Sequence, residues 1–272
     1  TITANQSFED VSLFVDANGS NNAVYLASNG ITVKASAGAQ NNEQGRIGNI
    51  TFTVVNLETL KFEISQGGDV STLCTSLVTD MNNLFQNNTT FNQDISSWDV
   101  SNVTDMGGMF FGSPFNQDIS NWDVSSVTEI GSMFRQSSFN QDISSWDVSN
   151  VFDMSSMFNT TPFNQDISSW SVDNVTNCTS FSDNCPLTEA NTPIFTNCPN
   201  IYLDTNGVTI KATATSANGY SEEIDGVTYT VVDLSTLNTM ISNGDDVTKV
   251  VTSLITDMNN LFQNNTTFNQ DI

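Results

Sequence analysis

The chain has 272 residues, with 30 Asp and Glu residues against 6 Lys and Arg residues and no histidine, and its formal net charge at pH 7 is −24. Nucleic acids and anionic membrane surfaces are bound by clustered Lys and Arg, so this charge excludes both as partners. No run of about 18 apolar residues is present, and we therefore expect no membrane-spanning helix and no direct insertion into a bilayer.

The first 23 residues differ from everything that follows. They lack the basic start and the apolar centre that are typical of a signal peptide. They also do not match residues 178–200, which precede a second copy of the sequence that begins at residue 24. We therefore interpret residues 1–23 as the end of a preceding segment of another kind.

Residues 24–68 are predicted to form a small β-rich start cap. Val24–Leu26 and Ile31–Ala35 flank a Ser-Asn-Gly turn and predict a hairpin. Ile50–Val55 alternates as a third strand, and Asn56 is expected to cap a helix. Such a cap is needed because the bare end of a repeat stack exposes apolar side chains and unpaired backbone groups.

From residue 69 to residue 178 the chain is dominated by one 24-residue sequence. A complete copy, FNQDISSWDVSNVTDMGGMFFGSP, begins at Phe91 and restarts at Phe115, Phe139 and Phe163 with no insertion or deletion. A fixed short period of this kind is typical of stacked repeats. Each copy carries one isoleucine and one tryptophan at constant positions, and we expect these to form a core ladder of Ile95, Ile119, Ile143, Ile167, Trp98, Trp122, Trp146 and Trp170.

The spacing of apolar residues predicts the structure of one copy. We interpret residues 95–100 as a short strand with its bend. Val103, Met106 and Phe110 stand at i, i+3 and i+7, which predicts a helix of about two turns. The sequence therefore predicts an α/β repeat fold, a solenoid in which short parallel strands form one wall and short helices the other.

The repeat loosens after Trp170. Ser171 replaces a repeated Asp, Cys178 stands at a Met position, and three later prolines interrupt any further copy. Residues 179–200 are therefore predicted to be a closing cap and linker. Residues 201–272 repeat residues 24–95 without a gap, so they form a second module that contains a start cap and a first coil. We expect this chain to be a piece of a longer protein built from tandem modules.

The cysteines stand at positions 74, 178, 185 and 198. Cys74 has Val251 as its counterpart in the second module, which indicates a small buried residue. Cys185 and Cys198 bracket an irregular segment in which a disulfide would remove chain entropy, so we predict that they are bonded, in an oxidising compartment. Free thiols are the alternative. A zinc site is a further alternative with little support, because the chain has no histidine and no CxxC motif.

One aspartate recurs at the same position of each copy. Stacked carboxylates about 5 Å apart repel one another by roughly 0.8 kcal/mol per pair even in water. We favour hydrogen bonds from the adjacent turn as the compensating interaction. The alternative is calcium, held with the help of asparagine carbonyls, as the one possible cofactor. The candidate metal ligands are Asp94, Asp118, Asp142 and Asp166, with Asn92, Asn116, Asn140 and Asn164 beside them.

We predict no catalytic residue. Acyl-transfer triads and most metal hydrolases use a histidine, and the chain has none. A glycine-rich phosphate loop and a dinucleotide fingerprint are also missing. Paired carboxylates could serve a glycosidase, but here they recur in copy after copy, as a scaffold requires.

The sequence FNQDISSWDVSNVTDMGGMF resembles the repeat of the BspA-like leucine-rich-repeat surface proteins of bacteria. The similarity extends to the start cap YTVVDLSTL and to the closing PIFTNCP, and so covers about residues 24–272. This resemblance implies a leucine-rich-repeat-like solenoid, an extracellular or cell-surface location and an adhesive role. Ser171 and Cys178 depart from a Trp-Cys pair that relatives often carry, which leaves the disulfide partner of the closing cap open.

Three functions are considered. The leading hypothesis is a non-enzymatic extracellular surface repeat protein that acts as an adhesin or as a structural fibre or stalk module. Its partners would be other copies of itself, or glycans or proteins on host or environmental surfaces. The alternative is a calcium- or glycan-binding receptor module that uses the repeated Asp, Asn and Trp ladders. An ice- or mineral-binding array ranks last, because it needs a flat threonine surface.

Overall fold

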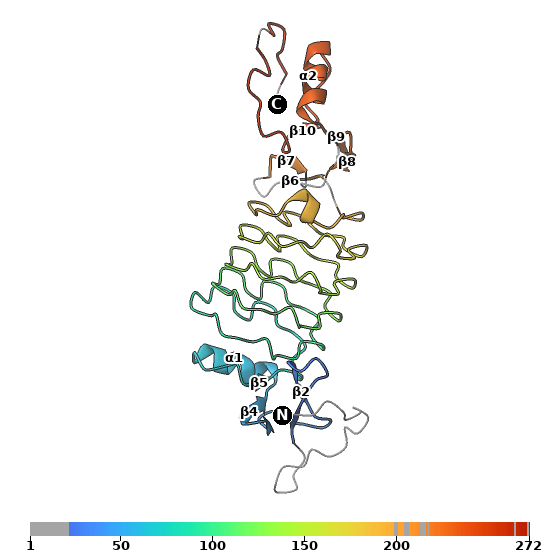
Figure 1. Ribbon diagram of the computed structural model, residues 1–272. Helices are drawn as coiled ribbons and strands as arrows, with labels where there is room; N and C mark the ends of the chain where they lie inside the picture. The colour runs from blue at the N-terminus through green and yellow to red at the C-terminus, as the bar shows by residue number, and fades with distance from the viewer. Residues whose placement is uncertain are drawn as a thin grey trace.

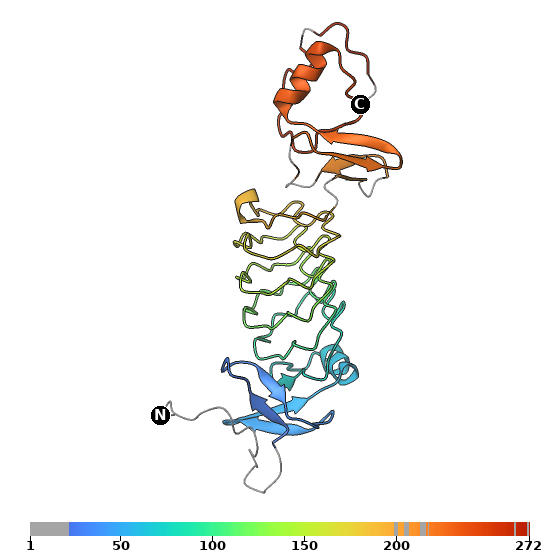
Figure 2. The same ribbon diagram turned by 90° about the vertical axis from the view of Figure 1, so that its right-hand side faces the viewer.

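The computed structural model describes residues 22–198, 201–203, 207–212, 216, 218–263, 265–270 and 272. The segment interpreted as the end of a preceding region, residues 1–23, lies almost wholly outside the described residues. Two views at right angles show the coils of the repeats between an N-terminal unit of sheets and a helix and a C-terminal unit of the same kind (Figures 1 and 2). We call residues 69–198 the repeat region.

The N-terminal unit begins with a hairpin. β1 (Val24–Leu26) pairs antiparallel with β2 (Val33–Ala35). In the turn between them, the side-chain oxygen of Asn29 accepts hydrogen bonds from the backbone N–H groups of Ile31 and Thr32. The hairpin therefore forms where the Ser-Asn-Gly signal predicted it.

A second sheet of the N-terminal unit contains three strands. β3 (Gln44–Ile47) pairs antiparallel with β4 (Ile50–Val54), and β5 (Leu73–Cys74) adds to β4 in the parallel sense. β4 buries Phe52 and Val54 against Cys74 and the first hairpin. The alternating pattern of β4 predicted this strand, whereas β3 has a weak pattern, QGRI, and was missed.

Helix α1 (Leu57–Ser65) follows β4. Asn56 has extended backbone, and its side-chain oxygen accepts the backbone N–H of Thr59 at 2.9 Å, so the predicted cap is confirmed. The helix buries Leu60 completely, with Leu57 and Ile64 partly buried against the core of the repeat region. The helix thus joins the N-terminal unit to the first coil.

The C-terminal unit repeats this arrangement. Its first sheet pairs β6 (Ile201–Leu203) with β7 (Ile210–Ala212), and its second contains β8 (Ser221–Ile224), β9 (Val227–Val231) and β10 (Val250–Val251) in the order β10-β9-β8. Helix α2 (Leu234–Asn243) is capped by Asp233 and ends at Gly244 with left-handed backbone. The short 3-10 helix η1 (Glu189–Asn191) lies in the segment before this unit.

The repeat region is built from turns. Successive copies are joined by isolated parallel bridges, from Asp80 to Asp105 and onward through Glu129 and Asp153 to Asn177. Alternate backbone N–H groups also donate to the next copy: Met106 to the carbonyl of Glu129 at 2.9 Å and Gly108 to that of Gly131 at 2.8 Å. Each copy is therefore a coil that is held by the coil after it.

The predicted fold class, an α/β solenoid of short parallel strands and short helices, is wrong. Within the described residues the regular strands belong to four small sheets whose longer pairings are antiparallel, and the α-helices are α1 and α2 alone. The segment 95–100 contains no regular strand, and the segment 103–110 is a series of turns. The repeats supply stacked turns in place of both elements.

Backbone conformation explains why the predicted helix is absent. Gly108, Ser132, Ser156 and Ser180 occupy one position of successive coils, and all have positive φ, between 54° and 60°. A right-handed helix cannot pass through such a residue. Alternate N–H groups of this segment donate to the next coil, and those between them, such as Met109 to Met106, donate to the carbonyl three residues earlier instead of four. The i, i+3, i+7 pattern was real, but it marks side chains that point into the stack.

The core of the repeat region is continuous. The four isoleucines and four tryptophans of the core ladder are all buried in one hydrophobic cluster that runs from Val55 to Cys198. Each indole N–H donates to a backbone carbonyl of the preceding coil, as Trp122 does to Ile95 and Trp146 to Ile119, both at 3.2 Å. Phenylalanine rings stack parallel along the same direction, for example Phe110 on Phe134 at 5.8 Å. One copy alone could not enclose these rings.

Candidate functional site

The repeated aspartates are occupied by local hydrogen bonds. Each carboxylate accepts the backbone N–H of the serine two residues later, at 2.9 to 3.0 Å, in the pairs Asp94 with Ser96, Asp118 with Ser120, Asp142 with Ser144 and Asp166 with Ser168. The backbone N–H and hydroxyl of Ser144 lower the pKa of Asp142, although the neighbouring charge of Asp166 raises it. Hydrogen bonds of the favoured kind are therefore present.

The asparagines beside this column bond from coil to coil. Asn92 accepts the backbone N–H of Asn116 at 2.9 Å, and Asn116 accepts that of Asn140 in the same way. In the part of the chain that the structure describes, no three Asp, Glu, Cys or His side chains are grouped so that they could hold a metal ion. Calcium binding by the Asp column stays a prediction.

The tryptophan rings are not accessible to a ligand. Trp98, Trp122, Trp146 and Trp170 are between 0% and 5% exposed. Their indole N–H groups are also used inside the core, where they bond backbone carbonyls. The Trp ladder therefore supports the fold, and a contact surface has to be found elsewhere.

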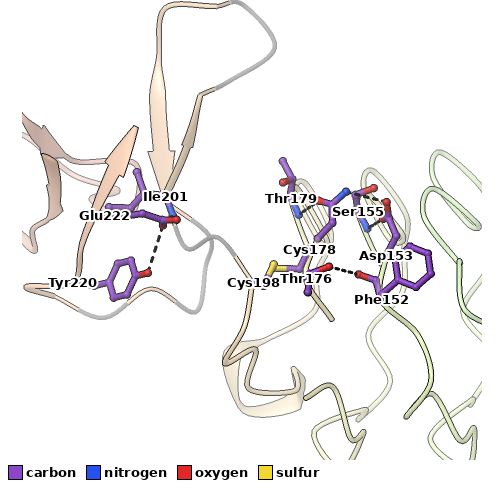
Figure 3. The surroundings of a disulfide bond; sticks show 11 residues. Phe152, Asp153, Ser155, Thr176, Cys178, Thr179, Cys198, Ile201, Tyr220 and Glu222 are labelled. Carbon is purple, nitrogen blue, oxygen red and sulfur yellow. Dashed lines mark hydrogen bonds between the residues drawn. A yellow bond between two sulfur atoms is a disulfide. The ribbon is translucent and has the colours of Figure 1, made fainter. Parts of the chain in front are cut away.

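The predicted disulfide between Cys185 and Cys198 is wrong. Cys178 is bonded to Cys198 (Figure 3), and Cys185 is a free thiol. Cys178 stands at the buried Met position of the last coil, so its sulfur faces the closing segment that carries Cys198. Both bonded residues belong to the core of the repeat region.

Cys185 occupies a different position of the repeat. The equivalent residues of the earlier coils are Ser113, Ser137 and Thr161. Like a hydroxyl, the Cys185 thiol donates locally, to the backbone carbonyl of Phe163 at 3.0 Å, and burial raises its pKa. The repeat register, which separates a core position from a hydroxyl position, was the signal that could have identified the bonded pair.

The two parts of each repeat differ in how much they vary. At each position from Phe91 to Thr104, compared across the four copies, at most one copy carries a different residue. From Asp105 to Pro114, every position differs in at least one copy. At the position of Phe111, for example, the later copies carry Arg135, Asn159 and Asp183. The coil therefore combines a constant part with a variable part.

A groove of about 350 Å³ lies on the variable part. It crosses the coils that contain residues 82–86, 105–111, 129–135 and 153–155. Its lining consists of Asn82, Asn83, Gln86, Gly107, Gly108, Phe111, Glu129, Gly131, Ser132, Arg135, Asp153 and Ser155. No residue from the constant part of a complete copy contributes, so the departures from the repeat gather in one place.

Hydrogen bonds hold the walls of the groove. Asn82 donates to both carboxylate oxygens of Asp105, at 3.1 and 3.2 Å, and its side chain lies close over Gly107. Asp153 accepts the backbone N–H of Ser155 at 2.7 Å (Figure 3) and the side-chain amide of Asn177 at 2.9 Å. These carboxylates are held in place by neutral donors and keep their negative charge.

Two charged groups in the groove have no such partner. Within the described residues, the half-buried Glu129 carboxylate makes no hydrogen bond and no ion pair. The guanidinium carbon of Arg135 lies 5.5 Å from the centre of the Phe111 ring, and the buried Nε of Arg135 has no hydrogen-bond acceptor. A buried donor without a partner costs about 1–3 kcal/mol.

A second cavity, of about 220 Å³, lies in the C-terminal unit between α2 and residues 254–257. Its lining includes Leu254 and Ile255, which correspond to Leu77 and Val78 of the first module. Val78 is completely buried, because later coils pack on the first module. The second cavity therefore marks a position that another coil covers in the first module, and the Arg135 groove is the stronger candidate site.

The chain matches a known protein family. Residues 55–158, 111–195 and 230–272 match the family described as Mycoplasma protein of unknown function, DUF285. These matches cover more than half of the chain. The chain belongs to the DUF285 family. No curated protein and no solved structure gives a significant match.

No helix among the described residues is long and apolar enough to cross a membrane.

Proposed function

We propose that this DUF285 protein is a non-enzymatic surface repeat module, of the BspA-like type, that acts outside the cell as an adhesin. The observation that carries the proposal is the division of each coil. Buried residues of both parts form one continuous core from Val55 to Cys198, and the remaining positions of the variable part build a groove on that frame. Such a frame displays different side chains on one surface without altering the core.

Further features support an extracellular location. The bonded Cys178 and Cys198 are of the kind found in oxidising compartments. The net charge of −24 and the many uncharged polar residues favour solubility. The chain contains no histidine, the side chain that most often serves as general base, which supports a binding role.

The partners we propose are other copies of this chain, or glycans or proteins on another surface. A bead-retention experiment tests the proposal. Beads coated with the purified chain are passed over three surfaces, coated with the same chain, with glycoproteins or with polysaccharides. We expect retention on at least one surface, above that of beads coated with an unrelated acidic protein. Equal retention of both kinds of bead on all three surfaces would contradict adhesion.

The calcium-dependent receptor is the second candidate, because the Asp column brings like charges together in successive coils. The same beads are tested in millimolar calcium and in EDTA at one ionic strength. Retention that disappears in EDTA would favour the calcium receptor. Retention that is unchanged would favour an adhesin whose Asp column serves only the coil.

A further inference from the structure

We propose that the groove around Arg135 is a binding site for a neutral oligosaccharide, with Glu129 and Arg135 hydrogen-bonding its hydroxyl groups beside the Phe111 ring. This inference rests on the proposed function and gives the adhesin a defined contact site. It places the ligand away from the repeated Asp, Asn and Trp ladders.

The size and shape suit a small ligand. A volume of about 350 Å³ lies within the range of small-molecule sites. Three glycines line the groove, Gly107, Gly108 and Gly131. At each of them a side chain of another coil fills the space that a Cβ atom would occupy; at Gly108 the side-chain oxygen of Asn83 would lie only 2.2 Å from such an atom. A ligand would therefore contact these polar side chains and not the glycine backbone.

The groove contains both hydrogen-bond donors and hydrogen-bond acceptors. The Glu129 carboxylate can only accept hydrogen bonds, whereas the Arg135 guanidinium can only donate them. Gln86 and Ser132 add an amide and a hydroxyl to the lining. A sugar hydroxyl both donates and accepts, so neighbouring hydroxyls of one ring can satisfy Glu129 and Arg135 together. The partly exposed Phe111 ring provides an apolar face for the C–H groups of the same ring.

Charge decides against the other ligand classes. An anionic ligand would meet Glu129 and Asp153 in the groove and a net charge of −24 around it. The net charge would attract a cationic ligand, but in the groove that ligand would lie beside Arg135, the one cationic side chain in the repeat region. A neutral, hydroxyl-rich ligand meets neither penalty.

The chain offers its own substitutions for a test. Arg135→Asn installs the residue that the next copy carries at this position, Asn159, so the variant is compatible with the coil. Glu129→Gln keeps the shape of the side chain and removes its charge. Asn121→Ser, on the constant part, installs the residue of Ser97 and Ser145 and serves as the matched control. Thermal melting of each variant verifies that it is folded.

The experiment screens the full chain on an array of neutral, sialylated and sulfated glycans, and then measures the Kd of the best neutral glycan by calorimetry. We expect neutral glycans to bind. Loss of a hydrogen bond to a charged group should weaken binding about tenfold or more in Arg135→Asn and in Glu129→Gln, with Asn121→Ser unchanged.

Three outcomes would overturn the site. Binding of acidic glycans alone would show that Arg135 acts as an anion site. Unchanged Kd values in both folded groove variants would place glycan binding elsewhere on the chain. No glycan binding at all, with beads still retained on a protein surface, would reject the oligosaccharide site and leave the adhesive function standing.

Discussion

The two modules carry the same 17 residues, 79–95 and 256–272, in different surroundings. In the first module Met81 and Phe85 are 0% and 1% exposed, whereas their counterparts Met258 and Phe262 are 42% and 36% exposed. The difference arises from the next coil. Met81, Asn83 and Phe85 donate backbone hydrogen bonds to residues 105, 107 and 109 of the coil that packs on them.

Local geometry is nearly the same in both modules. Asn83 and Asn260 have φ of 55° and 63°. The side chain of Gln93 accepts the backbone N–H of Val70 at 2.8 Å, and Gln270 accepts that of Val247 at 2.7 Å. Turns and side-chain clamps are therefore specified within one coil, whereas burial is supplied by the neighbouring coil.

The largest difference in stability between the two modules is expected when the equivalent phenylalanine is replaced by alanine in each of them. Phe85→Ala should lower the unfolding free energy of the first module by about 3–5 kcal/mol, because it leaves a cavity between Phe91 and Phe110. Phe262→Ala should cost the second module far less, since that ring is already partly in water. Native-state hydrogen exchange, read separately for each module, measures both values. Equal losses would refute burial by the next coil.

The disulfide strengthens the end of the first module. Cys198→Ala opens a covalent loop with a sequence separation of 20, and we expect the stability of the repeat region to fall by about 3 kcal/mol. The four tryptophans all lie in the repeat region, so urea unfolding followed by Trp fluorescence reports on it directly. Cys185→Ser is the control. It should change the midpoint little, because the thiol occupies a hydroxyl position of the repeat.

A smaller loss of stability is expected when the contact between the N-terminal unit and the repeat region is weakened. The Lys34 ammonium lies 3.5 Å from Asp99, whose side chain is only 4% exposed, and the Ser76 hydroxyl donates to the same carboxylate at 2.5 Å. Asp99→Asn should cost about 1–2 kcal/mol in the urea experiment. Asp123→Asn removes the equivalent but exposed carboxylate of the next coil and should cost almost nothing. A loss of equal size in both variants would show that docking is unimportant.

The smallest effect on stability is expected from the lowered pKa of one aspartate in each module, and it should be equal in the two modules. The hydroxyl and then the backbone N–H of Ser71 lower the pKa of Asp69, and Thr248 lowers that of Asp246 in the same order. A lowered pKa means that the folded state binds fewer protons than the unfolded state. This stabilisation is therefore present above about pH 4 and is lost as pH falls through the folded pKa.

NMR titration of the Asp69 and Asp246 carboxyl groups checks this expectation. Both should titrate below the ordinary value, and Ser71→Ala and Thr248→Ala should move the respective pKa upward by similar amounts. A normal pKa for Asp246 alone would show that even the turn depends on the following coil.

The sequence alone determined the features that arise within one coil. The 24-residue period, the buried Ile and Trp positions and the caps of the two helices follow from side chains that act on neighbouring residues. The groove could have been located in part from the sequence, because the positions that depart from the repeat lie between 105 and 114 and their equivalents.

The tertiary structure decided whatever depends on contacts between coils. Val103, Met106 and Phe110 have helical spacing, yet their segment is a turn, because Gly108 has left-handed backbone and Met106 donates to Glu129 of the next coil. The partner of Cys198 depended on the direction in which the last coil presents Cys178. Each of these outcomes joins residues about 20 positions apart, and the residue pattern of a single coil does not contain the free energy of stacking one coil on another.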